Sequence, residues 1–231
     1  GVRDGAWGWG ACAADFNNDG WLDLFHENGF GAMPDYARSH IPDYMMAFLP
    51  ANYADFHTDH PRLFINKGIN KGTNTGANSG DVRFEDESAA WGLDMQTNGR
   101  GVVCVDYDRD GDIDVVLTEN VAAPRLLENR TRGLGAARFI GFHVLASPPN
   151  TQALGATLTL KAGGMTQQRQ VLANSNYQSQ NPATIHFGVG SSEVVTELHV
   201  RWPDGIEETL ADIPTDQYYP LLHPQLRSSG K

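Results

Sequence analysis

The sequence predicts an all-β protein, and three observations support this fold class. Many short stretches alternate apolar and polar residues at every second position, which is typical of half-buried strands. Twenty-five Gly and twelve Pro separate these stretches, as expected for a chain with many turns. One acidic motif occurs twice, which indicates an internal repeat in the first part of the chain.

The repeated motif has the composition of a cation-binding loop. Its copies are Asp15-Phe-Asn17-Asn-Asp19-Gly20-Trp21-Leu-Asp23 and Asp106-Tyr-Asp108-Arg-Asp110-Gly111-Asp112-Ile-Asp114. Side-chain oxygens stand at loop positions 1, 3, 5 and 9, and Gly at position 6 permits the turn that brings them together. Calcium accepts several such oxygens in flexible geometry, whereas magnesium loses its waters reluctantly, so we expect two calcium ions.

The ligands predicted for each ion follow from these positions. The first ion is expected to bind Asp15, Asn17, Asp19, Asp23 and the carbonyl of Trp21. The second is expected to bind Asp106, Asp108, Asp110, Asp114 and the carbonyl of Asp112. The loops are not EF-hands, because position 12 is His26 or Leu117 instead of Glu. Both loops are followed by alternating residues, so Asp23 and Asp114 are predicted to begin strands.

Both parts of the chain resemble known families. Residues 10–25 and 101–116 are similar to FG-GAP/VCBS repeats, which build calcium-binding blades of β-propellers in extracellular proteins. Residues 61–68, 82–88 and 91–93 match the other strands of such a blade, and residues 124–129 repeat the first of these segments. Residues 154–156, 178–180, 186–190 and 200–205 resemble the ASPIC/UnbV domain. The resemblance does not extend to residues 27–60.

The resemblance implies a partial β-propeller over residues 1–130, followed by an ASPIC/UnbV domain over residues 138–226. In the second part, alternation over residues 139–145, 156–160, 184–187 and 197–200 predicts a β-sandwich. Turns are expected at residues 162–164 and 203–205, and Trp202 is expected in the core. Two blades cannot close a propeller, which has four to eight. We therefore expect the remaining blades to come from the same polypeptide or from another chain.

The function implied is a calcium-binding structural or binding module, at the cell surface, in the periplasm or outside the cell. A protein or glycan partner is expected, with its contact surface on the long segment 31–60. The net charge of −11 argues against nucleic acid, and no apolar run is long enough to span a membrane. No Gly-x-Ser-x-Gly, P-loop or Gly-x-Gly-x-x-Gly motif occurs, so no catalytic residues are predicted, and Ser175, Ser179 and His186 are interpreted as packing and turn residues.

The alternative function is a metal-dependent enzyme or cofactor protein. The segment 31–60 contains His40, His57 and His60, and His26 could join them from a strand end. Two imidazoles in His57-Thr-Asp-His60 can reach one transition-metal ion, although the spacing matches no established ligand motif. Copper, iron or zinc in stoichiometric amount in the purified protein would favour this alternative. Calcium alone would favour the calcium-binding module.

The two cysteines are expected to be buried free thiols. Cys12 lies three residues before Asp15, whereas Cys104 lies two before Asp106. On equivalent strands these side chains point to opposite faces, which argues against a disulfide but leaves it open.

Overall fold

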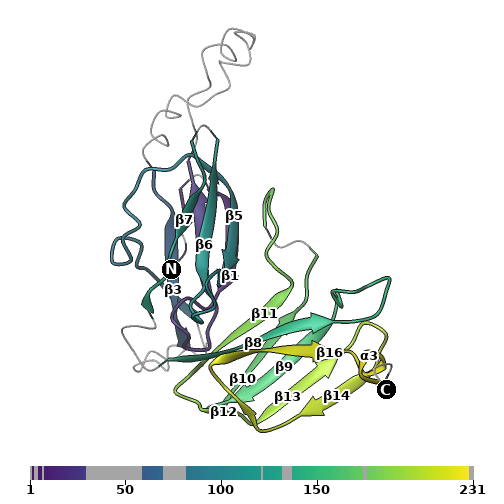
Figure 1. Ribbon diagram of the computed structural model, residues 1–231. Coiled ribbons are helices and arrows are strands. Elements are labelled where there is room, and N and C mark those ends of the chain that lie inside the picture. The colour runs from purple at the N-terminus through teal and green to yellow at the C-terminus, as the bar shows by residue number, and fades with distance from the viewer. Residues whose placement is uncertain are drawn as a thin grey trace.

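The computed structural model describes residues 2, 5–6, 8–29, 59–69, 82–120, 122–131, 137–173 and 176–228, and it confirms the all-β fold class. Figure 1 shows two parts, with the strands of one standing across those of the other. We call residues 8–131 the repeat region and residues 137–228 the C-terminal sandwich.

The repeat region contains two antiparallel sheets, with strand orders β1-β2-β3-β4 and β5-β6-β7. The strands are β1 (Gly8–Ala14), β2 (Asp23–Asn28), β3 (Arg62–Ile69), β4 (Val82–Asp86), β5 (Gly99–Val105), β6 (Asp114–Glu119) and β7 (Arg125–Leu127). As predicted, β2 and β6 begin at Asp23 and Asp114. The described residues form no closed ring of sheets, so the propeller arrangement remains a prediction.

The two sheets repeat each other in detail. The β1–β2 pair ends at Ala14 opposite Asp23, and the β5–β6 pair ends at Val105 opposite Asp114. Each pair also has one register shift near its far end, between Gly8 and Ala11 in β1 and between Gly99 and Val102 in β5. The internal repeat is therefore a repeat of backbone geometry as well as of sequence.

A disulfide joins Cys12 of β1 to Cys104 of β5, with Cα atoms 6.5 Å apart, so the prediction of free thiols is wrong. Cys12 stands two residues before the strand end at Ala14, and Cys104 one residue before the end at Val105. The side chains therefore do lie on opposite faces of equivalent sheets. Because the two sheets pack against each other around one apolar core, these opposite faces are the ones that meet.

The C-terminal sandwich has two main sheets, with strand orders β10-β9-β13-β14 and β11-β8-β16, and a β12–β15 pair. Its strands are β8 (Arg138–Leu145), β9 (Thr157–Ala162), β10 (Met165–Gln170), β11 (Thr184–Gly190), β12 (Val194–Val195), β13 (Glu197–Arg201), β14 (Glu207–Leu210), β15 (Ile213–Pro214) and β16 (Gln217–Leu222), and helix α3 (Pro224–Ser228) follows. Side chains from both sheets form one core, which supports the predicted sandwich. Trp202 is 1% exposed within it, as expected.

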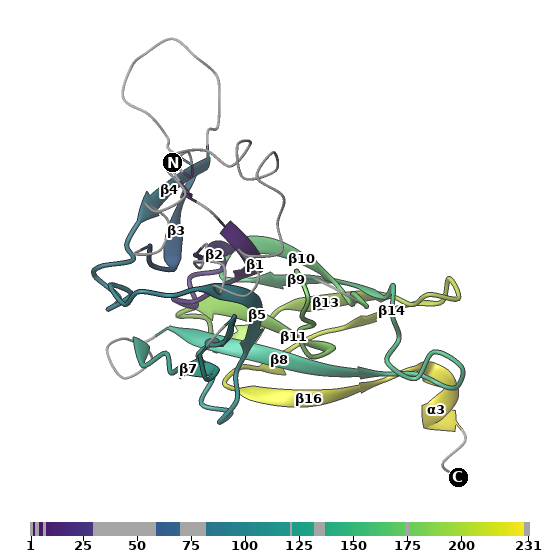
Figure 2. The same ribbon diagram turned by 90° about the horizontal axis from the view of Figure 1, so that it is seen from above.

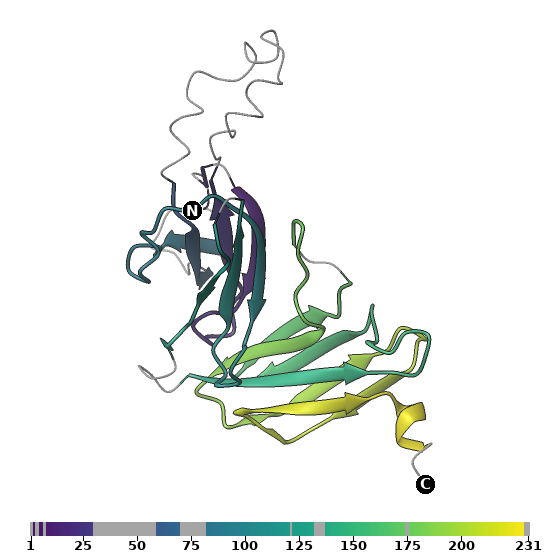
Figure 3. The ribbon, with the colours of Figure 1, turned by 45° about the horizontal axis from the view of Figure 1, so that its top comes forward.

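The end of the repeat region that carries the acidic loops rests on the sandwich. Figures 2 and 3 show the β1 and β5 ends beside β8, β10 and β11. Residues 176–183 of the sandwich also reach β5 along its edge. Asn176 and Ser179 side chains bond to the carbonyl of Val102 at 2.7 Å each, and the Cys104 N–H donates to Asn181 Oδ1 at 2.9 Å. Polar side chains thus cover an edge that would otherwise expose unpaired backbone groups.

Candidate cation-binding loops

The first acidic loop, residues 15–22, wraps its backbone around the side chains of its own acids. Asp15 Oδ1 accepts the N–H of Asp19 at 3.0 Å, and Asp15 Oδ2 accepts the N–H of Gly20 at 2.7 Å. Asp19 Oδ1 accepts the N–H of Trp21 at 2.8 Å. Gly20 has φ +96°, a conformation that favours Gly, which explains its place at the turn.

The second loop, residues 106–113, repeats two of these hydrogen bonds at equivalent positions. Asp106 Oδ2 accepts the N–H of Gly111 at 2.9 Å, and Asp110 Oδ1 accepts the N–H of Asp112 at 2.9 Å. Gly111 has φ +97°, and Arg109 has φ +65°, close to the φ of +58° at Asn18 in the first loop. A polar turn without a function would not require this agreement in hydrogen bonding and backbone conformation.

Each loop is closed by an Asp at the start of the next strand and by an Asn that sequence reasoning missed. Asp23 accepts the N–H of Asn66 at 2.8 Å, and Asp114 accepts the N–H of Asn129 at 2.7 Å. The amides of these two Asn residues also donate to carbonyls at the ends of the loops, Leu22 and Ile113. The signal was present in the sequence, since Asn66 and Asn129 occupy the same position in the repeated segments 61–66 and 124–129.

Burial makes the carboxylates costly as free charges. It raises the pKa of Asp15 to about 7, with a further contribution from the negative charge of Asp19. Burial also raises the pKa of Asp23 to about 7 and that of Asp114 to about 6, against the opposing effect of backbone N–H donors. The pKa of Asp106 is raised for the same reason. A divalent cation would remove this penalty by supplying the missing positive charge.

The second loop gathers its acids more closely than the first. Oxygens of Asp106, Asp108 and Asp114 lie within 4.8 Å of one another, and this is the one group of three potential ligands of this kind in the described part of the chain. Asp106 Oδ1 is buried and receives no hydrogen bond of normal geometry from the described residues. An oxygen-rich pocket with such an atom fits a hard cation like calcium. In the first loop, Asn17 replaces the acid at the position of Asp108.

Other predicted ligands are engaged within the loops. Asp19 Oδ1 and Asp110 Oδ1 hold their loops by accepting the N–H groups of Trp21 and Asp112, and Asp19 Oδ2 accepts the side-chain amide of Asn17 at 3.0 Å. Asn17 Oδ1 accepts the N–H of Asp19 at 3.1 Å. That the carbonyls of Trp21 and Asp112 bind the ions stays a prediction.

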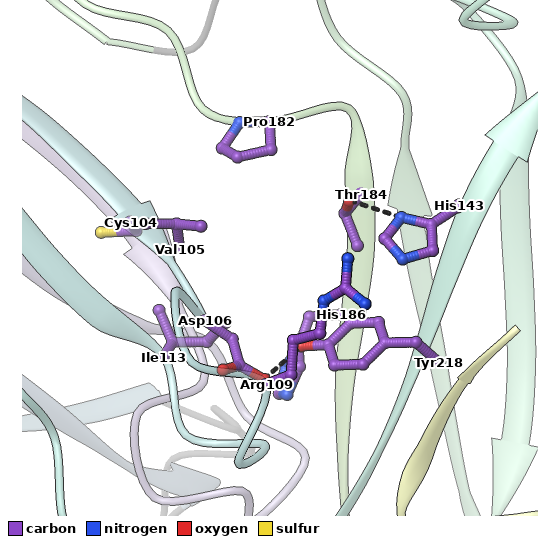
Figure 4. A pocket seen from close by; sticks show the side chains of 10 residues that line it. All are labelled: Cys104, Val105, Asp106, Arg109, Ile113, His143, Pro182, Thr184, His186 and Tyr218. Carbon is purple, nitrogen blue, oxygen red and sulfur yellow. Dashed lines mark hydrogen bonds between the residues drawn. The ribbon is translucent and has the colours of Figure 1, made fainter.

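The C-terminal sandwich contacts the second loop directly, as Figure 4 shows. The Tyr218 hydroxyl donates to Asp106 Oδ2 at 2.6 Å, and Tyr218 and Asp106 help line a small cavity of about 70 Å³. His186 Nε2 lies 3.1 Å from the carbonyl of Gly111, and burial lowers the pKa of His186 to about 4. A neutral imidazole with its proton on Nε2 therefore donates to the loop. The interpretation of His186 and Ser179 as packing and turn residues was incomplete, and Ser175 lies outside the described residues.

The histidines of the alternative site are not gathered in the described part of the chain. His57 and most of segment 31–60 lie outside it. His26 stacks on Phe64 with ring centroids 5.7 Å apart, and burial lowers its pKa. His60 Nδ1 lies 3.8 Å from Asp59 Oδ1. No group of three metal ligands among the described residues includes either histidine.

The C-terminal sandwich matches a known domain family. Residues 146–228 match the family model described as ASPIC and UnbV, so the chain carries an ASPIC/UnbV domain. The chain is also similar to two proteins named cartilage acidic protein 1. It is 25% identical over 250 aligned positions to the human protein, covering 94% of this chain, and 27% identical over 157 positions to the mouse protein, covering 63% of this chain. It spans only 36% and 23% of their respective lengths.

No helix among the described residues is long and apolar enough to cross a membrane.

Proposed function

We propose that this chain is a calcium-binding module in which two ions fix the turns between paired strands. The observation that carries the proposal is the matching geometry of the loops, which places Asp15 and Asp23 at the same positions as Asp106 and Asp114. The ions would neutralise carboxylates that burial otherwise disfavours.

The sheets of the repeat region are proposed to be FG-GAP/VCBS blades of a larger propeller. The repeated hydrogen bonds, the repeated register shift and the similarity to cartilage acidic protein 1 support this arrangement. The remaining blades would come from the same or another polypeptide. The Cys12–Cys104 disulfide supports an oxidising location, which is extracellular, periplasmic or at the cell surface. The proposed protein or glycan contact on segment 31–60 lies almost wholly outside the described residues.

Calcium titration by calorimetry is expected to give two ions per chain. Asp19→Ala and Asp110→Ala should each remove one ion and leave the other, because each side chain accepts a backbone N–H within its own loop. Asp94→Ala is the matched control, since Asp94 is an exposed acid outside both loops and should leave two ions bound. Two ions still bound in both loop variants, or a wild-type chain that binds none, would contradict the proposal. An elemental scan of the purified protein that finds zinc, copper or iron instead would favour the alternative metal-dependent enzyme.

Calcium removal is expected to lower the melting temperature. Extracellular calcium modules bind with dissociation constants of about 0.1–1 mM, so at about 1 mM calcium each site stabilises the fold by about 0.4–1.4 kcal/mol. For two sites this corresponds to roughly 2–10 °C in a domain of this size. Differential scanning calorimetry with calcium and with EGTA measures the difference. Equal melting temperatures in protein shown to have been loaded with calcium would refute a stabilising role for the ions.

A further inference from the structure

We propose that the C-terminal sandwich recognises the cation-bound form of both acidic loops, so that calcium binding and docking of the sandwich on the repeat region are coupled. The inference rests on the proposed calcium sites. It adds the residues whose contacts depend on the conformation of the loops. The sandwich contacts backbone carbonyls of the loops and the side chains of Asp15 and Asp106, and a bound ion would fix the positions of both. Three sets of contacts carry the proposal.

The first contact is a close approach of β11 to the first loop. A side chain at Gly188 would place its Cβ 2.2 Å from Asp15 Oδ2 and 2.5 Å from the Cα of Asn18, so only Gly fits there. Two residues later, the N–H of Gly190 donates to the carbonyl of Asn18 at 2.9 Å. The side chain of Gln167 donates to the carbonyl of Gly188 at 2.7 Å and holds this strand end in place. If the loop opened, the contacts of Gly188 and Gly190 with it would be lost together.

The second contact is made by Tyr218 on the second loop. Its hydroxyl donates to Asp106 Oδ2, the same oxygen that accepts the N–H of Gly111. Its ring lies over Gly141 of β8, where a Cβ would come within 2.1 Å of ring atoms, and it also packs on Phe139. Tyr218 is therefore held rigidly by its own domain and fixes a predicted ligand of the other. We assign it as a positioning residue for the second ion.

The third contact joins the two loops. Asn18 is 1% exposed, and its side-chain amide donates to the carbonyl of Gly111 at 3.1 Å and to Asp112 Oδ1 at 3.0 Å. Its own carbonyl accepts from Gly190 of the sandwich. Asn18 therefore touches the second loop with its side chain and the sandwich with its backbone. Ordering of one loop should favour ordering of the other, because both loops share this residue.

The thermodynamic consequence is reciprocal. If calcium favours the docked arrangement, then docking raises the affinity for calcium by the same factor. The contacts of Asn176, Ser179 and Asn181 with β5 do not involve the loops and should persist without calcium. Calcium removal is therefore expected to open the interface locally at β11, while the β5 edge stays covered.

Amide exchange followed by NMR on the whole chain tests the coupling. Addition of EGTA is expected to speed exchange of the Gly190 N–H at least tenfold, because its acceptor is the backbone of the first loop. The N–H groups of Val102 and Cys104, which bond to Ser179 and Asn181, serve as internal controls and should change much less. Calorimetry on the same sample verifies calcium binding and its removal.

Two variants extend the test to the named residues. Tyr218→Phe keeps the ring and removes the hydroxyl, and it is expected to weaken one of the two calcium sites about tenfold, the usual effect of removing a hydrogen-bond partner of a ligand. Tyr219→Phe is the matched control, because that hydroxyl donates to the Pro214 carbonyl and touches neither loop. Asn18→Gly tolerates the φ of +58° and removes the bridging amide, so binding of the two ions should become independent.

The outcomes separate the two proposals. Two bound ions with equal Gly190 exchange in calcium and EGTA would reject the coupling and leave the calcium sites standing. Wild-type affinity in Tyr218→Phe would reject its positioning role. A wild-type chain that binds no calcium would reject both the sites and the coupling.

Discussion

Replacing Cys12 and Cys104 together with Ala is expected to lower the free energy of unfolding by about 2–4 kcal/mol, the usual contribution of a native disulfide. The disulfide closes a long loop, with a sequence separation of 92, and so restricts the unfolded chain strongly. It also ties the two sheets of the repeat region to each other through their shared core. The expected fall in melting temperature is roughly 4–16 °C for a chain of this size.

Reduction of the wild type provides the matching experiment. Dithiothreitol should lower the melting temperature of the wild-type chain and leave that of the double Ala variant unchanged. Thiol titration of the unfolded, unreduced protein should find no free thiol, because the described chain pairs both cysteines. Two free thiols in protein purified without reductant would contradict the disulfide. They would support the sequence-based expectation that both cysteines are free.

Much of the fold could be predicted because it depends on local patterns. Alternation placed β2, β6, β8, β9, β11 and β13, and the acidic loops placed the ends of β1 and β5. The missed strands lack such a pattern. β10 reads Met-Thr-Gln-Gln-Arg-Gln, and its placement depends on its pairing with β9 along the whole strand. Tertiary contacts decide the secondary structure of such a segment, because its own side chains have little preference for a strand.

The contacts between the repeat region and the C-terminal sandwich could not be predicted from the sequence. They join residues far apart in the chain, and many of them are made by backbone groups that every residue has. Gly188 contacts the first loop through its backbone. Because Gly has no side chain, the sequence gives no sign of a contact with residues more than a hundred positions away. Tyr218 and Asp106 are likewise 112 residues apart. The disulfide was missed for a related reason. The alternation of side chains along the strands placed the two cysteines correctly on opposite faces of equivalent sheets, but it did not show that these two faces pack against each other.

A buried acid at the other end of the repeat region leads to the last prediction. Glu27 lies near the end of β2 and is fully buried, and its side chain packs directly over Gly99 of β5. Burial raises the pKa of Glu27 to about 8, and the nearby charge of Glu119 adds to this effect, although the Thr97 hydroxyl and two Arg residues oppose it. Glu27 is not among the predicted calcium ligands, so its titration reports on the core instead of the ion sites.

Glu27 is therefore expected to make the protein less stable as the pH rises. The folded state holds the proton more tightly than the unfolded state, where the pKa is the ordinary 4.5. The favourable contribution is complete below pH 4.5 and is lost progressively as the pH rises through about 8. Since one pKa unit corresponds to about 1.4 kcal/mol, the loss is at most about 5 kcal/mol.

Glu27→Gln removes this titration and keeps the shape of the side chain, so the variant is expected to be more stable than the wild type at pH 9 by about 2–5 kcal/mol. At pH 5 the two proteins should differ little, because both then carry a neutral group at this position. Urea unfolding across this pH range, at saturating calcium so that the acidic loops contribute equally, measures the difference. Glu193→Gln serves as the control, since that side chain is 79% exposed on the C-terminal sandwich and should not alter the pH dependence. A stability difference between wild type and Glu27→Gln that stays constant from pH 5 to pH 9 would show that Glu27 does not hold its proton in the folded protein.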